Sequence, residues 1–482
     1  MRIHRSFFLA LALAVSWICI VNADVTVNYD PDNDGSIYRY QLTVTPAAES
    51  VPAFKHRLVV EPENTIAGNA ITHYLRSLGE RSLDAPLQAA RARFGEKFYT
   101  WYELETPETA IPVGDLKSAV SLFEFYVENH LKRATKCRDA DWGLALEDLR
   151  GPETIEFLLP SVQQTRSMAR ILLLRNRLAL LEGRFKDSVE SIRMIYKLGQ
   201  NVNELKFLVA GLVGTAEVGM ANGAVLQLIG TKDSPNMYWS LAELETPIID
   251  IRESLRLERS LGMRYLKELD GIESKEYTDE KWNELLQSTL DSIFRVVVQN
   301  NPGPEVIKLK PSGLALASYS TAKRRLAKSG FTSEQLESMS VAQLILIDGT
   351  REYRRITDEC EKMFYVPFDR VAEFETELNR LQRPTQLGEI LAETFLPAAG
   401  QIRYASARTQ AQLNALMVIE SLRHHAAKTG QFPNSLDELT LPVRIDPITN
   451  LPFPYRNENG TAYLEHAMNR SLKAVYEIKL AK

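Results

Sequence analysis

Cysteine is scarce in this sequence, with 3 residues among 482. Cys19 lies in the apolar N-terminal segment, so Cys137 and Cys360 are the two found in the rest of the chain. A chain of this length with two cysteines is not a disulfide scaffold, although one bond between them is compatible with an oxidising compartment. Two unpaired thiols in helical surroundings are the alternative. Neither cysteine has a second Cys or a His at zinc-site spacing.

The sequence also lacks the short motifs of common enzyme classes. It contains no Gly-x-Ser-x-Gly elbow and no glycine-rich phosphate loop ending in Lys-Ser or Lys-Thr. Its histidines form no His-Glu-x-x-His pattern, and we expect the adjacent His424 and His425 to lie on the surface. Acidic pairs are frequent in a chain that is 25% charged, so their spacing in the sequence does not identify any of them as a catalytic dyad. The sequence therefore assigns no catalytic residue, metal ligand or cofactor.

Positive charge is not in excess. The chain has 57 Lys and Arg against 62 Asp and Glu, a formal net charge of −5. Nucleic-acid-binding proteins usually carry a strong basic excess, so we expect no nucleic-acid partner.

The first 23 residues have the pattern of a secretory signal. Basic Met1–Arg5 precedes an apolar run over Phe7–Val21, and Val21-Asn22-Ala23 provides small residues for cleavage. We therefore expect a mature chain that starts at Asp24 and lies outside the cytoplasm, in the periplasm or secreted. Ile18 stands before Cys19 where a lipidated cysteine requires a small residue, so a lipid anchor is not favoured.

The centre of the chain reads as three consecutive helices. Apolar residues repeat every three to four positions over 161–182 and 187–198, and the segment 204–229 is apolar nearly all round. We expect Gly183 to end the first helix and Gly199 to end the second. Short connections favour antiparallel packing, with 204–229 as the buried member. Along that member, small residues recur every four positions and predict a close helix contact: Gly211, Thr215, Gly219 and Gly223.

The segment 207–229 is also long enough to cross a membrane. Glu217 near its centre would cost about 2.5–3.5 kcal/mol there, and Asn222 and Gln227 add to that cost. We therefore interpret it as a core helix and expect no transmembrane span after signal removal.

The two ends of the mature chain contain the strand patterns. Runs at 25–29 and 38–44 flank a turn-rich segment and predict a hairpin, with a third strand at 57–60. A long helix over 400–428 precedes a capping box at Ser435–Glu438, and a hairpin follows around Asn457–Gly460. Helical patterns also cover 312–329, 333–365 and 385–396.

These patterns predict a mainly α protein. Its body consists of many helices with helical-hairpin, solenoid-like packing, without the fixed repeat of a true solenoid. A small N-terminal β-hairpin precedes this body, and a long helix plus β-hairpin follows it. The predicted organisation is a signal peptide over 1–23, a β-hairpin region over 24–60, a helical core over 61–300, a second helical region over 301–399 and a C-terminal segment over 400–482.

Five segments carry a resemblance to known proteins: 133–148, 157–166, 183–203, 234–241 and 446–456. They resemble a group of uncharacterised secreted proteins of planctomycete bacteria. The tail also resembles the C-terminal end of major pseudopilins of type II secretion. That match rests on Gly430-x-Phe432-Pro433 and on Asp446-Pro447-x-x-Asn450-x-Pro452-x-x-Tyr455. The pseudopilin leader and its long N-terminal helix have no counterpart here, so the resemblance does not imply assembly into a pilus.

Four arginines form the strongest candidate for a binding site. Arg166, Arg170, Arg177 and Arg184 fall within one narrow arc at helical spacing, although Arg184 lies beyond the glycine stop. Guanidinium groups bind carboxylates and phosphates in bidentate fashion, so the stripe predicts a receptor for such groups or for an anionic polymer. The alternative is structural pairing with acidic residues of neighbouring helices: Glu182, Glu190, Glu204, Glu217, Glu253 or Glu258.

Two function classes remain open from the sequence. The first is a helical binding or scaffold protein of the cell envelope, whose partner is an envelope protein or an anionic polymer. The second is an extracytoplasmic hydrolase with a carboxylate-based active site. A polar cleft with two carboxyl groups and a raised pKa would favour the hydrolase.

Overall fold

The structure is a computed structural model. The predicted signal peptide Met1–Ala23 and the mature start at Asp24 lie outside the residues that it describes, so both stay predictions. The described residues are 25–29, 37–79, 82–104, 106–107, 110–144, 160–300, 310–374, 384–395, 399–468 and 472–481.

The described residues divide into two compact units. The first contains the described residues of 252–403 and is called the 252–403 unit. The second, called the sheet unit, contains the described residues of 25–144, 160–251 and 404–481. These units group the chain differently from the predicted ranges. The predicted helical core 61–300 divides between the units after Ile251, whereas the strand-bearing ends of the mature chain belong to one unit.

Helices dominate both units, and the protein is mainly α as predicted. The sheet unit contains the following helical elements before its centre: η2 (Pro62–Asn64), α2 (Ala70–Leu78), α3 (Asp84–Phe94), η3 (Glu96–Thr100), α4 (Val113–Tyr126), the π-helix η5 (Val127–Leu131) and α5 (Lys132–Lys136). A short parallel pair, β3 (Ile66–Asn69) and β4 (Cys137–Asp139), lies among them.

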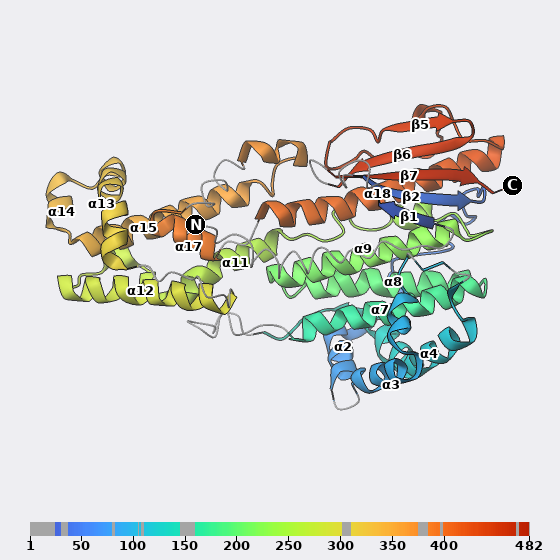
Figure 1. Cartoon of the computed structure of the whole chain (residues 1–482), viewed down its shortest axis with the longest axis horizontal. Coiled ribbons are helices and arrows are strands. Elements are labelled where there is room, and N and C mark those ends of the chain that lie inside the picture. The colour runs from blue at the N-terminus through green and yellow to red at the C-terminus, as the bar shows by residue number, and fades with distance from the viewer. Residues whose placement is uncertain are drawn as a thin grey trace. The chain divides into compact units, whose positions relative to one another are not determined.

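Three long helices form the centre of the sheet unit, as the sequence predicts. They are α7 (Pro160–Leu181), α8 (Phe185–Asn203) and α9 (Leu208–Gly230), and they lie side by side in Figure 1. Gly183 ends α7 with a left-handed φ of 67°, which lets the amide of Arg184 donate to the Ala179 carbonyl at 2.7 Å. Helix α9 is buried nearly all round, as its composition indicates.

Gly199 does not end the second helix, contrary to our prediction. Helix α8 continues to Asn203, and Gly199 instead lies against Gly214 of α9. A Cβ at Gly199 would lie 2.8 Å from the Gly214 carbonyl oxygen, and a Cβ at Gly214 would lie 2.5 Å from the Gly199 oxygen. The glycines therefore permit two helix backbones to touch, and the predicted close contact is displaced from the Gly219 face.

The glycines of α9 differ in how closely they are packed against their neighbours. A Cβ at Gly219 would meet no heavy atom within 4 Å in the described part of the chain, so Gly219 does not make the close contact that we expected. At Gly223 of the same stripe, a Cβ would lie 2.9 Å from Leu104 Cδ1, so that position is closely packed. Gly214→Ala should lower the free energy of unfolding by about 1–3 kcal/mol, because the added carbon overlaps backbone. Gly219→Ala should raise it by about 0.8–1.0 kcal/mol through helix propensity. Urea titrations of the two variants check the opposite signs, and equal shifts would contradict this packing.

The strands of the two chain ends form one sheet. Its order is β1 (Val25–Tyr29), β2 (Ile37–Val44), β7 (Lys473–Leu480), β6 (Thr461–Ala467) and β5 (Tyr455–Glu458). Both predicted hairpins are present, as the antiparallel pairs β1–β2 and β5–β6. The sequence did not predict β7, which joins them by pairing in parallel with β2 and antiparallel with β6.

Of the remaining predictions for the two chain ends, one is wrong and one is confirmed. The predicted third strand at 57–60 is absent, because that segment is irregular in the described structure. The capping box of Ser435 and Glu438 is present and opens the short helix η9 (Leu436–Glu438). The long helix α18 (Ala399–Thr429) runs along the sheet in Figure 1, and its Thr409 carbonyl accepts a 3.0 Å hydrogen bond from Asn222 of α9.

The 252–403 unit has its own hydrophobic core. Trp282, Leu344 and Ile356 belong to one continuous cluster of buried side chains in this unit. The predicted helices at 312–329, 333–365 and 385–396 are present, the second of them as two helices. The helical elements are α11 (Arg252–Tyr265), η6 (Lys267–Leu269), η7 (Ile272–Ser274), α12 (Asp279–Asn300), α13 (Pro311–Lys328), α14 (Ser333–Ser338), α15 (Val341–Lys362), η8 (Phe368–Phe374) and α17 (Leu387–Phe395).

Candidate functional site

The four arginines of the predicted stripe occupy four different environments. Arg184 is exposed and pairs with Glu182 and with Asp187. Arg177 is fully buried and donates to the backbone carbonyl of Thr106. The structure therefore does not gather the stripe into one surface, and the two remaining members have to be considered separately.

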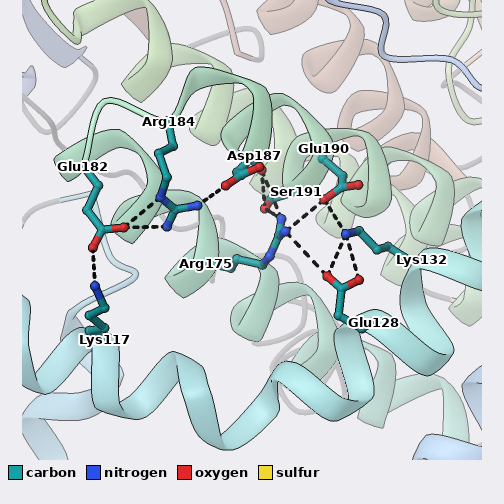
Figure 2. A network of polar contacts seen from close by, with 9 residues as sticks. All are labelled: Lys117, Glu128, Lys132, Arg175, Glu182, Arg184, Asp187, Glu190 and Ser191. Atoms are coloured by element: carbon teal, nitrogen blue, oxygen red, sulfur yellow. Dashed lines mark hydrogen bonds and ion pairs between the residues drawn. The ribbon is translucent and has the colours of Figure 1, made fainter.

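Much of the charge near the stripe belongs to a polar network between helices. Figure 2 shows Arg184 reaching both Glu182 and Asp187, while Lys117 of α4 meets the other oxygen of Glu182 at 3.1 Å. Arg175, which the sequence argument overlooked, is buried and pairs with Glu190 at 2.9 Å. These contacts tie α4 and its continuation to α7 and α8, which is the structural pairing offered as the alternative.

The same network continues around Arg175. Its guanidinium donates to Ser191 Oγ at 2.8 Å, and Lys132 bridges Glu190 at 3.0 Å and Glu128 at 2.6 Å. Because every cation in this group faces a carboxylate, its net field is small. We infer that this part of the surface holds helices together and is not available to an anionic ligand.

Arg166 lies beside a buried carboxyl group. Glu217 of α9 has no exposed surface, and its Oε1 and Oε2 make no hydrogen bond within the described structure. Burial raises the pKa of Glu217 to about 8, although the nearby Thr165 hydroxyl and Arg166 charge oppose that shift. A raised pKa was one of the features expected of a hydrolase, but Glu217 is buried among helices and does not line a cleft.

Arg170 is the stripe residue that faces a pocket. The pocket has a volume of about 320 Å³ and lies between α3, η3 and α7. Arg91 of α3 provides a second guanidinium, so two positive groups line the same space. The other lining residues are Asp84, Leu87, Gln88, Phe98, Tyr102, Ser167, Ile171 and Leu174.

The walls of this pocket combine charge with aromatic surface. The Arg170 guanidinium lies 5.9 Å from the centre of the Tyr102 ring, within the range of a cation–π contact. Burial raises the pKa of Glu103, and the Arg170 charge opposes that shift. The sequence analysis named neither Tyr102 nor Phe98 as a site residue, because nothing in their spacing distinguishes a pocket wall from a core.

The histidine and cysteine predictions have mixed outcomes. His424 is buried, contrary to our expectation of a surface residue, and its Nδ1 accepts from the Glu49 amide at 3.0 Å.

Cys137 is buried in the sheet unit and Cys360 in the core of the 252–403 unit. A disulfide between them stays a prediction. Across the described ranges, no three His, Cys, Asp or Glu side chains gather closely enough to hold a metal ion.

Helix α9 is the one described helix that is long and apolar enough to cross a membrane, judged by length and composition. In its most apolar window, 83% of the residues are buried inside the protein, which fits a core helix.

Comparison of the chain with known protein families, with curated proteins and with solved structures found no match.

Proposed function

We propose that the protein is a binding module of the cell envelope that holds an acidic sugar of an anionic polysaccharide in the pocket between α3, η3 and α7. The observation that carries this proposal is that Arg91 and Arg170 line one pocket that also has an aromatic wall. It rests on an extracytoplasmic location, which the predicted signal at 1–23 supports. A partner for the pseudopilin-like tail is no part of the proposal.

The chemistry of the lining fits a carboxylated sugar. Guanidinium forks match the two oxygens of a carboxylate, and the polar groups of Asp84, Gln88 and Ser167 suit sugar hydroxyls. The Tyr102 ring provides a flat face against which a sugar ring packs. A volume of about 320 Å³ is near the lower end for ligand sites, so one or two sugar rings fit.

The surroundings of the pocket also favour an anionic ligand. The Arg170 guanidinium lies over the Tyr102 ring, and the charge of Glu103 acts on it without an ion pair among the described residues, whereas Arg175 and Arg184 are ion-paired with carboxylates. Its charge is therefore less neutralised than theirs. A carboxylate that enters the pocket gains a charge-assisted hydrogen bond, which contributes about 1.5–3 kcal/mol.

Calorimetric titration with digalacturonate tests the proposal. The wild-type protein should bind digalacturonate and should bind the uncharged galactose disaccharide at least tenfold more weakly. Arg170→Met should weaken digalacturonate binding by about tenfold or more, because loss of one charged hydrogen bond is worth at least about 1.4 kcal/mol.

Arg256→Met is the matched control for that variant. Arg256 lies in the 252–403 unit, also over a tyrosine ring, with 5.7 Å between its guanidinium and the centre of Tyr365. Its replacement should leave digalacturonate affinity unchanged. Equal losses in the two variants, or equal binding of the charged and uncharged sugars, would reject the pocket as the site.

A further inference from the structure

A second arginine of the sheet unit, Arg408, has buried nitrogen atoms without a hydrogen-bond partner among the described residues. Nε and Nη2 of Arg408 on α18 are buried, and neither makes a hydrogen bond in the described structure. Burial lowers the pKa of Arg408, while Tyr40 and Tyr38 of β2 oppose that shift. A guanidinium does not lose its proton in a protein, so a buried one requires acceptors from elsewhere.

The neighbours of Arg408 already use their polar atoms on one another. His466 Nδ1 lies 2.9 Å from the Ala467 carbonyl, and its Nε2 lies 3.3 Å from the Tyr476 hydroxyl. A neutral imidazole that donates to the carbonyl accepts from the tyrosine, so its two nitrogens are both engaged. The pKa of His466 is lowered by burial and by the Arg408 charge, which keeps the ring neutral.

The carboxylate whose charge acts on His466 is also engaged. Asp446 is buried, and its Oδ1 accepts from the Ile448 amide at 2.8 Å. Its Oδ2 accepts from the Ala467 amide at 3.0 Å. Asp446 therefore fixes the turn that begins at Asp446-Pro447 and closes it against β6, and it does not pair with Arg408.

The two unused nitrogens of Arg408 form one edge of the guanidinium. Elsewhere in the chain this same edge is filled by a carboxylate: Nε and Nη2 of Arg351 donate to the two oxygens of Glu273 at 2.9 and 2.6 Å. Arg355 places the same edge on Glu352 at 2.9 and 2.8 Å. The edge of Arg408 has the geometry for two oxygens, and the described residues supply neither of them.

We propose that Arg408 anchors a site for a small oxyanion, either a monocarboxylate or phosphate, between α18 and the end of the sheet where β2 and β7 begin. A free anion is favoured over a protein segment because the unpartnered edge is buried, so the ligand must be small. The ring stack of Tyr40 and Tyr476, with centres 4.8 Å apart, forms a fixed wall of the cluster. The site is separate from the pocket of Arg170, and its existence does not depend on the sugar proposal.

Thermal unfolding of the full chain in acetate, phosphate or chloride at constant ionic strength tests the site. A ligand that binds only the folded state raises the melting temperature as its concentration exceeds the dissociation constant. Acetate, phosphate or both should give a saturable rise for the wild type. A rise with phosphate alone identifies a tetrahedral ligand, and a rise with acetate alone identifies a carboxylate.

Three variants separate the site from general salt effects. Arg408→Met should abolish the saturable rise in melting temperature. Arg408→Lys keeps the charge but loses the two-nitrogen edge, so it should raise the apparent dissociation constant of the anion at least tenfold. Arg456→Met, at an exposed arginine on β5 of the same sheet, should leave it unchanged. A wild-type rise equal in chloride, or one that persists in both Arg408 variants, would overturn the proposal.

Discussion

Arg423→Met should lower the free energy of unfolding by about 3–5 kcal/mol, because it breaks a fully buried ion pair and leaves a carboxylate without its partner. Arg423 and Glu420 have no exposed side-chain surface, and their charged groups lie 2.9 Å apart on consecutive turns of α18. Burial raises the pKa of Glu420, while Arg423 and the Met237 amide oppose that shift.

The loss should exceed that of a single ion pair because Arg423 joins three segments. Its Nε donates to the Thr45 carbonyl at 3.0 Å, just after β2. Its Nη2 donates to the carbonyl and hydroxyl oxygens of Ser234, both at 2.9 Å, in the loop that follows α9. Methionine has a similar length and no donors, so each of these acceptors would stay buried without a partner.

Guanidinium chloride titrations of four proteins measure this effect. Arg456→Met removes ion pairs of an exposed arginine with Glu458 and Glu465 and should cost less than about 1 kcal/mol. Adding Glu420→Gln to Arg423→Met should recover part of the loss, because the uncompensated charge disappears. A loss below about 1 kcal/mol for Arg423→Met would show that the three segments are held by other contacts.

Local sequence patterns predicted the helices well because their signals are local. The periodic apolar residues of α7, the glycine stop at Gly183 and the capping box at Ser435 each involve neighbours within one or two turns. The pairing of β2 with β7 joins residues more than 400 positions apart, such as Ile37 and Lys473. No local pattern specifies such a contact, which explains why β7 was missed and why the two chain ends were assigned to separate regions.

The glycines of α8 and α9 show a second limit of sequence reasoning. A four-residue spacing along α9 indicated a packed face at Gly219, whereas the close contact lies at Gly214 and its partner Gly199. Gly199 was interpreted as a helix stop because glycine both ends helices and permits close approach. The choice between these roles depends on what the neighbouring helix presents, and one sequence does not contain that information.

The candidate site was predicted in part. The sequence identified Arg170 through the helical arc of the stripe, but Arg91 lies on another helix with no spacing that relates it to Arg170. It also grouped Arg170 with Arg177, which is fully buried. An arginine that lines a pocket and one that is buried in the core have the same letter and the same helical phase, so only the packing of α3 against α7 distinguishes them.

A buried acid gives the other large expected effect. The folded-state pKa of Glu217 is about 8, above the ordinary value of 4.5, because burial favours its neutral form. The folded state therefore holds this proton more tightly than the unfolded state does. The resulting stability is fully present at low pH and is lost as the pH rises from about 4.5 to about 8.

Glu217→Gln should remove this pH dependence, because an amide of the same shape does not titrate in that range. The stability of the variant relative to wild type should increase by about 1.4 kcal/mol per pH unit between pH 5 and pH 7. Glu465→Gln is the control. Burial works against ionisation of Glu465, but donors from Lys473 and Arg456 outweigh it and lower the pKa of Glu465. Its relative stability should therefore stay constant over the same range.

Urea titrations at pH 5, 6 and 7 distinguish two roles for Glu217. If the stability of Glu217→Gln relative to wild type increases with pH, the Glu217 carboxyl is a neutral core group whose ionisation destabilises the fold. Parallel curves for wild type and variant would mean that Glu217 stays charged at neutral pH, held by Arg166. In that case the Glu217–Arg166 pair, and not apolar packing alone, would fix α7 against α9, and Arg166→Met should then destabilise the protein more at pH 7 than at pH 5.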